Sequence, residues 1–484
     1  MIFHCLEYLF FLAAVLLLYW PLPRVWQNAL LVAASYVFYG WANPLFSVLM
    51  LVSTTIDYVC GLFIANQFGR RAWKGPVPLL PPGGARTRQQ RIALIVTISS
   101  NLSLLGFFKY FNFFAENAAA AFASIGWNIP LPVLNVVLPV GISFYTFQSI
   151  GYVVDVYRRQ TPACRNLLDY MVFVSLFPQL VAGPIMRAGQ LVTQVRSKRV
   201  FDAERVQSGL LLMLWGFFKK LVIADNVAVI ANKVFAMQEP NFPILWTGVL
   251  AFCVQIYADF SAYTDIARGT ARLLGFELIK NFNNPYAAES PSDFWKRWHI
   301  SLSTWIRDYI YIPLGGSHVG PSRAVANILI VFFLTGLWHG ASWNFVLWGL
   351  YNGVLILTYR LAAWGLPQSL QTFPSAKILR IALMFVLTNI GWLIFREQNI
   401  AALWRDLTLS PAAAPMLDWK VAAYLCTVIG FYSLPLLLHA VVGNLRIPLP
   451  TRSFAAQCTA GVALFIGVLV LRSSLSADFI YFQF

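Results

Sequence analysis

Charged side chains are scarce in this chain of 484 residues, where they make up only 11% of the sequence. An average soluble domain carries about 25%. Apolar residues account for 59%, and apolar stretches recur along the whole length. This composition excludes a disordered protein, a nucleic-acid-binding protein with a soluble body and a small disulfide-stabilised secreted module. It is typical of an all-α polytopic membrane protein embedded in the lipid bilayer.

Several signatures of bound groups are also missing. The six cysteines show no C-x-x-C spacing, so they predict neither disulfides nor a thiolate metal site. The histidines match no zinc spacing such as H-E-x-x-H, and we expect no metal ion. The chain lacks the phosphate loops G-x-G-x-x-G and G-K-[ST] and the G-x-S-x-G nucleophile elbow. We therefore expect no permanently bound cofactor.

Acidic residues are outnumbered by basic ones, and the formal net charge is +16. The basic residues gather in the stretches 66–91, 158–165, 187–205 and 280–323. Since Lys and Arg are enriched in cytoplasmic loops, we assign these stretches to the cytoplasmic side. Counting back three spans places the N-terminus outside the cytoplasm. The N-terminal segment has no basic region and no cleavage site, so we expect it to be retained as a membrane span.

Apolar segments predict the membrane helices, and several of these are expected to be broken, tilted or re-entrant. Segment 207–236 carries Lys219 and Lys220 in its middle. Segment 166–186 contains Pro178 and Pro184, which break helices, and a full crossing would place the basic stretch after it outside. The candidate spans are 2–20, 29–41, 45–65, 92–115, 133–157, 166–186, 207–236, 244–274, 324–359, 377–395, 419–440 and 454–472. We expect one integral membrane domain over 1–484, with N-terminal helices at 1–132, a catalytic core at 133–360 and C-terminal helices at 361–484.

The most polar stretch beside a membrane segment is 281–316. Ser290, Pro291 and Asp293 predict the start of a helix, with a cap, a proline in the first turn and a capping box. An interfacial amphipathic helix explains most of the residues that follow. His299 lies at the border of its apolar stripe, and taken alone it is explained as well by a structural hydrogen bond. The residues near one face at helical spacing are Phe294, Trp298, Leu302, Trp305 and Tyr309.

His339 follows the apolar run 324–338. An ionisable residue at this depth is costly and is by default a hypothesis for a functional site. Gly336 and Gly340 bracket Trp338 and His339, so the backbone there can approach a neighbour or a ligand closely. The alternative is a buried neutral imidazole that ties two helices together.

A polar stripe interrupts the apolar segment 252–268. Asp259 and Asp265 are intramembrane carboxylates, which act as proton relays or satisfy the interior of a helix bundle. Asp265 and Arg268 are spaced to pair on one helix face. The sequence leaves the structural and the catalytic role open.

These features suit direct transfer of an acyl group from a thioester to a hydroxyl. A neutral imidazole can take the proton of the attacking hydroxyl, and a thiolate leaves readily. The phosphates of a CoA-like donor, or of a phosphopantetheine carrier, would favour a cationic cytoplasmic face.

The sequence resembles the membrane-bound O-acyltransferase (MBOAT) family, in the bacterial branch that acylates alginate and teichoic acids. The resemblance covers almost the whole chain, and the RWHISLS and LWHG motifs are its most specific parts. It is carried by ASYVFYGW at 34–41, LPVGISFYTFQSIGYVVDVYR at 138–158, FPQLVAGPIMR at 177–187, DFSAYTDIARG at 259–269, the block at 284–316, TGLWHGASWNFVLWGLYNG at 335–353 and the terminal FIYFQF.

The resemblance implies a ring of tilted and re-entrant helices around a cytoplasmic funnel. It implies that His339 is the catalytic histidine and that His299 is the second catalytic position, on the helix that lines the funnel. The residues expected to shape the funnel or bind substrate are Arg297, Trp298, Ser303, Trp305, Arg307, Asp308, Trp338, Asp259 and Asp265.

The function expected on this basis is O-acetylation of an exopolysaccharide such as alginate or cellulose. Acetyl-CoA would be the cytoplasmic donor, the bacterial inner membrane the location, and an extracytoplasmic SGNH-type acetyltransferase the partner; no nucleic acid is expected. One alternative is transfer of D-alanine or another acyl group from a carrier protein to a cell-envelope polymer. The other is a non-catalytic membrane transporter.

Overall fold

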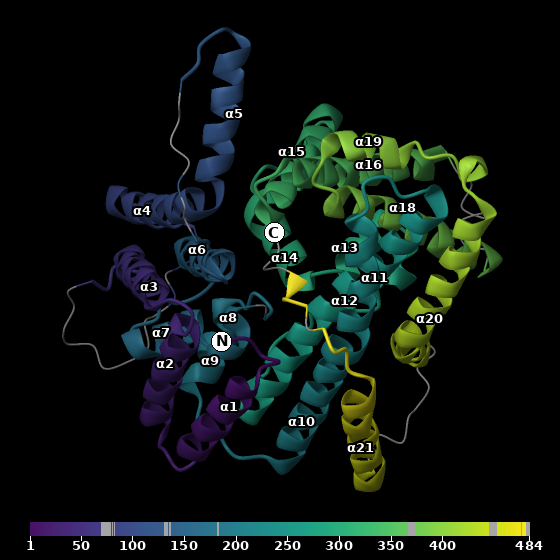
Figure 1. Cartoon of the computed structure of the whole chain (residues 1–484). Helices are drawn as coiled ribbons and strands as arrows, with labels where there is room; N and C mark the ends of the chain where they lie inside the picture. Colours follow the sequence, from purple (N-terminus) through teal and green to yellow (C-terminus); the bar gives the residue numbers. More distant parts are fainter. Residues whose placement is uncertain are drawn as a thin grey trace. The chain divides into compact units, whose positions relative to one another are not determined.

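The structure, a computed structural model (Figure 1), describes residues 1–68, 79, 81, 83–129, 134, 137–181, 183–365, 374–444, 453–475 and 477–480. Within these residues all regular secondary structure is helical, which confirms the predicted class. Three predicted features lie outside the described residues. They are the part of the basic loop that holds Arg70, Arg71 and Lys74, the start of the predicted span 133–157, and the last four residues of the terminal FIYFQF motif.

The chain forms two compact units, and α10 and α12 contribute residues to both. Unit 1 comprises Met1–Gly209 and Ala267–Ile279, and unit 2 comprises Leu210–Ile266 and Lys280–Phe484. The elements up to α12 are α1 (Leu6–Tyr19), α2 (Arg24–Gly40), α3 (Pro44–Ile64), α4 (Arg88–Leu105), the π-turn η1 (Gly106–Tyr110), α5 (Phe111–Ser124), α6 (Ile142–Arg158), α7 (Leu167–Ser175), α8 (Phe177–Leu180), α9 (Ala188–Arg196), α10 (Ala203–Phe218), the π-turn η2 (Lys219–Ala224), α11 (Asp225–Phe235) and α12 (Phe242–Leu273).

The remaining elements all belong to unit 2. They are the 3₁₀ turn η3 (Pro285–Ala287), α13 (Pro291–Arg297), α14 (Ile300–Ile306), the π-turn η4 (Arg307–Tyr311), α15 (Pro321–His339), α16 (Trp343–Gly365), α18 (Pro374–Arg396), α19 (Ile400–Leu407), the 3₁₀ turn η5 (Pro411–Ala413), α20 (Met416–Asn444) and α21 (Phe454–Leu471).

Nine helices within the described residues are long and apolar enough to cross a membrane. The chain is therefore a multi-pass membrane protein, as predicted. The prediction of one continuous span over 324–359 was wrong. This stretch forms two helices, because extended backbone at Gly340 ends α15. The nine are Pro44–Ile64, Arg88–Ser124, Ala203–Phe235, Phe242–Leu273, Pro321–His339, Trp343–Ala362, Ala376–Arg396, Met416–Val442 and Phe454–Leu471.

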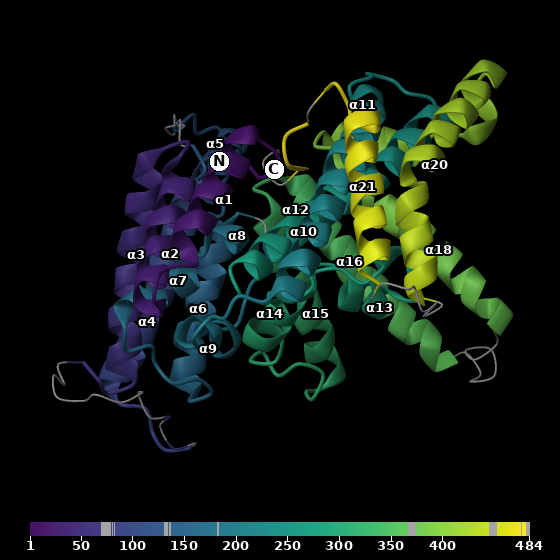
Figure 2. The same ribbon diagram turned by 90° about the horizontal axis from the view of Figure 1, so that it is seen from below.

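In unit 1, α1, α2 and α3 run side by side (Figure 2). Polar contacts between buried side chains join α3 to α4. The Asn101 amide on α4 donates to the Asp57 carboxylate on α3 at 2.9 Å, and the Ser53 hydroxyl donates to the Asn101 carbonyl at 3.1 Å. All three side chains are buried, so each polar group finds its partner within the protein.

The predicted break in segment 166–186 is present. α7 ends at Ser175 and α8 begins at Phe177, with Leu176 outside the helical region between them. α6 begins after Gly141, whose φ of 78° favours glycine. A Cβ at Gly141 would lie 2.4 Å from the Leu180 carbonyl oxygen, so the backbones of these two segments approach closely.

In unit 2, the run from α10 to α11 is interrupted where the sequence places its two lysines. Lys219 and Lys220 open the π-turn η2 and are buried. The Lys219 ammonium lies 2.8 Å from Asp265, and that of Lys220 lies 2.9 Å from Asp225 and 3.1 Å from Asp259. Paired charges explain how a membrane segment accommodates two lysines in its middle.

Glycine allows α15 and α16 to pack with their backbones in contact (Figure 1). A Cβ on Gly336 would lie 2.2 Å from the Phe345 carbonyl oxygen, and one on Gly349 would lie 2.2 Å from the Phe332 carbonyl oxygen. Neither position has room for a methyl group, because the obstacle is backbone. This close contact fixes the end of α15, where His339 is the last residue.

The substitution Gly349→Ala should lower the stability of the protein by about 1–3 kcal/mol, because the added methyl group must force α15 and α16 apart. Gly430→Ala is the matched control, since Gly430 lies inside α20 with nothing within 4 Å of a Cβ. We expect the control to unfold at or above the wild-type temperature. Thermal unfolding of the two purified variants in detergent checks this, and equal midpoints would contradict the close contact.

Candidate active site

The predicted helix start in segment 281–316 is confirmed. The Ser290 hydroxyl accepts the Asp293 amide at 3.1 Å, and Pro291 is the first residue of α13. The Asp293 carboxylate accepts the Glu289 amide at 3.2 Å, so the reciprocal bond reaches one residue further back than a standard capping box. Asp293 also holds Arg297 at 2.9 Å.

The periodicity predicted one helix through the whole aromatic stripe, and this prediction was wrong, because the helix is interrupted at Trp298 and His299. Trp298 is extended, with φ −100° and ψ 129°. His299 lies in the left-handed region, with φ 41° and ψ 55°, and α14 begins after it. Trp298 and Leu302 are each only 1% exposed, so the apolar stripe packs against other parts of the protein. A left-handed conformation at a residue other than glycine costs about 1–2 kcal/mol, which the surrounding structure must offset.

Two side chains stabilise the turn at His299. The Nδ1 atom of His299 accepts the Leu302 amide at 3.3 Å and so caps α14. The Asn281 backbone oxygen accepts the Ile300 amide at 2.9 Å, and the Asn281 side-chain oxygen accepts the Ser301 amide at 3.2 Å. The first amides of α14, which have no partner within the helix, are thus bonded inside the protein.

These contacts define the protonation state of His299. Its side chain is fully buried, outside the membrane-spanning helices, and burial lowers the pKa of His299 to about 3. The imidazole is therefore neutral at physiological pH. Because Nδ1 accepts a backbone amide, the single ring proton is on Nε2. His299 thus presents an N–H donor on the side of the ring away from α14.

Trp338 contacts both histidines. Its ring centroid lies 5.8 Å from that of His299 and 4.9 Å from that of His339, edge to face in both cases. The three side chains come from two separate elements, the turn before α14 and the end of α15. The structure therefore brings the two predicted catalytic residues into contact with one indole ring.

His339 is 6% exposed and is surrounded by aromatic side chains. Its ring lies edge to face against Trp348, at 4.9 Å, and against Phe395, at 5.4 Å. Asn344 secures this arrangement, because its amide donates to the Phe395 carbonyl oxygen at 2.8 Å. An imidazole in such apolar surroundings can act on a substrate from which water is excluded.

A cavity of about 200 Å³ lies next to this part of unit 2. Its lining includes Ser303 and Arg307 of the predicted residues, together with Arg360 from α16. Thr335 also lines it, one helical turn before His339 on the same face of α15. The cavity thus has two guanidinium groups and several hydroxyl groups in a lining that is mostly apolar.

The other predicted residues have partners of their own. Arg307 and Asp308 pair at 2.7 Å, Trp305 packs against Tyr309 at 5.0 Å, and the Ser303 hydroxyl donates to the Trp298 carbonyl at 3.1 Å.

Asp259 and Asp265 have the lysine partners described above. In addition, Asp259 accepts the Ile480 amide at 2.7 Å. No group of His, Cys, Asp and Glu side chains suited to hold a metal ion is found among the described residues.

Sequence reasoning missed Asn281, Asn344, Trp348 and Phe395. Each acts through a contact with residues distant in the chain, which local patterns do not reveal.

Residues 158–404 match the model of the MBOAT, membrane-bound O-acyltransferase family. Over 523 aligned positions, the chain is 36% identical to "Probable alginate O-acetylase AlgI" of Azotobacter vinelandii, with 100% of both chains covered. It is 34% identical to a "Peptidoglycan O-acetyltransferase" of Helicobacter pylori, covering 78% of this chain and 72% of the relative. It is 28% identical to a "Teichoic acid D-alanyltransferase" of Bacillus subtilis, covering 54% of this chain and 70% of that protein.

The chain belongs to the membrane-bound O-acyltransferase family. It is therefore an O-acyltransferase, and the resemblance found in its motifs is confirmed.

His299→Ala should destabilise the protein by about 2 kcal/mol, since it removes a helix cap and leaves a left-handed residue without a local hydrogen bond. His299→Asn should retain most of the stability, because asparagine tolerates this conformation and its side-chain oxygen can cap α14. Thermal unfolding of both variants is the measurement. If both lose stability equally, the cap is not what holds the turn.

Proposed function

We propose that this enzyme transfers an acetyl group from acetyl-CoA, on the cytoplasmic side, toward an extracytoplasmic exopolysaccharide such as alginate or cellulose. The observation that carries the proposal is the pair of buried histidines in contact with Trp338, in a chain of this family. The acetyl group is favoured because the relatives with 34% and 36% identity are named as O-acetyl-transferring enzymes, whereas the D-alanyl-transferring relative has 28%.

His339 acts as the general base in this proposal. Its imidazole takes the proton of the acceptor hydroxyl while the hydroxyl oxygen attacks the thioester carbon. The C–O bond forms, the C–S bond breaks, and the proton passes to the departing thiolate. The reaction balances without a nucleophile from the protein and without a further reactant.

His299 supplies a hydrogen bond to the reacting thioester. Since its proton is on Nε2, it can donate to the carbonyl oxygen, which becomes negative as the tetrahedral intermediate forms. Removing one such donor typically costs about 10²–10³ in rate. The variant His299→Asn separates this role from the structural one, because it keeps the cap of α14 but loses the Nε2 donor. Activity should fall by that factor while stability is retained.

The donor would enter from the side to which the basic stretches are assigned. Arg307 and Arg360 line the cavity together with Leu302 and Thr335, which lie within one helical turn of the two histidines, and guanidinium groups suit the phosphates of a CoA-like donor. This orientation places the N-terminus outside the cytoplasm of a bacterial inner membrane, following the distribution of Lys and Arg. Delivery to the polymer would then require an extracytoplasmic partner, for which the family resemblance suggests an SGNH-type acetyltransferase.

His339→Gln should lower acetyl transfer by at least about 10²-fold, the contribution expected of a positioned general base, with normal membrane insertion. The measurement is the acetate released by mild alkali from the surface polymer of cells that carry only the variant. His318→Ala is the control, because His318 is an exposed loop residue and its loss should leave acetylation unchanged. Wild-type acetate in the His339→Gln polymer would refute the catalytic assignment.

Donor identity can be tested in membranes that contain the protein. Incubation with acetyl-CoA labelled in the acetyl group should transfer label to the acceptor, and label on an acyl carrier protein should not move. The His339→Gln variant is the blank for both reactions. Transfer from the charged carrier alone would replace the acetyl-CoA proposal with the carrier-dependent alternative.

A further inference from the structure

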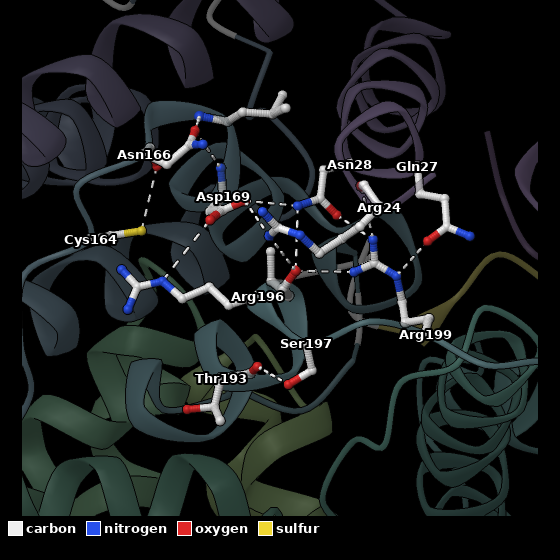
Figure 3. Close-up of polar contacts among 12 residues, drawn as sticks. Arg24, Gln27, Asn28, Cys164, Asn166, Asp169, Thr193, Arg196, Ser197 and Arg199 are labelled. Atoms are coloured by element: carbon white, nitrogen blue, oxygen red, sulfur yellow. Dashed lines mark hydrogen bonds and ion pairs between the residues drawn. The ribbon is translucent and has the colours of Figure 1, made fainter. Parts of the chain in front are cut away.

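Unit 1 contains a second concentration of charge, which the acyl-transfer chemistry does not use (Figure 3). Among the residues drawn in Figure 3, the buried carboxylate is that of Asp169 on α7. It accepts the Asn28 amide at 2.8 Å and lies 3.5 Å from Arg24 and 4.0 Å from Arg196. Together with Arg199, three guanidinium groups thus gather around a single negative charge.

Arg199 is held rigidly in this cluster. It is only 8% exposed, and it donates to the Gln27 side chain at 3.1 Å and the Asn28 side chain at 2.6 Å. Its guanidinium plane also lies over the rings of Tyr19, at 5.7 Å, and Phe276, at 5.1 Å. The side chain is therefore a fixed positive charge.

A hollow of about 680 Å³ opens beside Arg199. Lys198 and Arg205 line it as well, with Asp202 and Glu277 as the acidic members. Glu277 is paired with Arg272 at 3.0 Å, so its charge is largely neutralised. The lining thus holds three basic side chains against two acidic ones, and its net charge is positive.

Two of the lining cations are available to a ligand. Lys198 is exposed and makes no ion pair with a described residue. Arg205 is half-buried and also makes no ion pair with a described residue, and one nitrogen of its guanidinium group donates to the Val200 carbonyl oxygen.

The position along the chain gives the depth of the hollow in the membrane. The membrane span Ala203–Phe235 begins directly after Asp202, and the span Phe242–Leu273 ends shortly before Gly275, which also lines the hollow. Both helices are long and apolar enough to cross the membrane, so we place the hollow beside their ends at the level of the lipid headgroups.

The rim of the hollow is apolar. Val200 and Phe201 line it and are 64% and 58% exposed. The Phe201 ring packs edge to face against Trp20 at 5.3 Å. Exposed aromatic side chains beside cations are typical of the membrane interface, where acyl chains cover the rings and headgroups meet the charges.

We propose that this hollow binds the phosphate headgroup of an anionic phospholipid. The phosphate oxygens accept hydrogen bonds from the Lys198 ammonium and the Arg205 guanidinium group, Arg199 adds a third positive charge to the lining, and the acyl chains lie along Val200, Phe201 and Trp20. The apolar rim at headgroup depth favours a lipid over a soluble phosphate compound, which would gain nothing from it. The site is independent of the histidines of unit 2 and of the proposed function.

The test uses the full-length protein with the double substitution Lys198→Gln and Arg205→Gln. The control is Arg88→Gln with Arg91→Gln, which removes the same charge at the start of another unit 1 membrane span, from exposed side chains outside the hollow. Each protein is reconstituted in phosphatidylcholine nanodiscs with a minority of phosphatidylglycerol. Native mass spectrometry then counts the phosphatidylglycerol molecules retained after release from the discs, and thermal unfolding verifies that each variant is folded.

Wild type and control should retain phosphatidylglycerol in preference to phosphatidylcholine. The hollow variant should bind it about tenfold more weakly or worse, since Lys and Arg side chains near an anionic lipid attract its headgroup. Equal retention by the hollow variant and the control would overturn the proposal. Displacement of the lipid from wild type by CoA or inorganic phosphate would also overturn it, in favour of a soluble phosphate ligand.

Discussion

The hydrogen bond from the Leu302 amide to His299 Nδ1 determines how the candidate active site is built. A helix that ends inside a membrane protein leaves backbone donors without water, and these must be bonded within the protein. His299 meets this need for α14 and Asn281 shares it. The same bond fixes the ring against Trp338 and leaves the proton on Nε2. A single interaction thus stabilises the break in the chain and sets the direction in which the imidazole can donate.

In segment 281–316, the start of α13 could be predicted from the sequence, but the break in the helix at His299 could not. Ser290, Pro291 and Asp293 define the start of α13 through bonds among near neighbours, which leave a sequence pattern. The left-handed turn at His299 leaves no such pattern, because the apolar and aromatic residues on both sides of it still recur at helical spacing. Their spacing reflects burial against distant rings, as in the contact of Trp298 with Trp392 at 4.9 Å, and not one continuous helix.

Hydropathy likewise does not reveal the break in the helix at His339. The run 324–359 is apolar throughout, so composition alone indicates one long helix. The chain instead reverses after Gly340, and Gly336 and Gly349 let the two halves pack backbone to backbone. The sequence could identify the glycines beside His339 but not their partners, because those belong to the neighbouring helix. His339 lies where it does because that packing ends α15 at the aromatic residues Trp348 and Phe395.

In unit 2 the intramembrane carboxylates form ion pairs with lysines, whereas the buried imidazoles lie against aromatic side chains. Asp259 accepts the Ile480 amide and faces Lys220, and Asp265 faces Lys219. Removing one partner of a buried pair costs about 3–5 kcal/mol, because the other charge is left without compensation. Carboxylates bound in this way have their lone pairs engaged and are poor candidates to accept a substrate proton. An imidazole carries no charge in its neutral form, so it can remain in the aromatic interior without a counter-ion and still take a proton, as the role proposed for His339 requires.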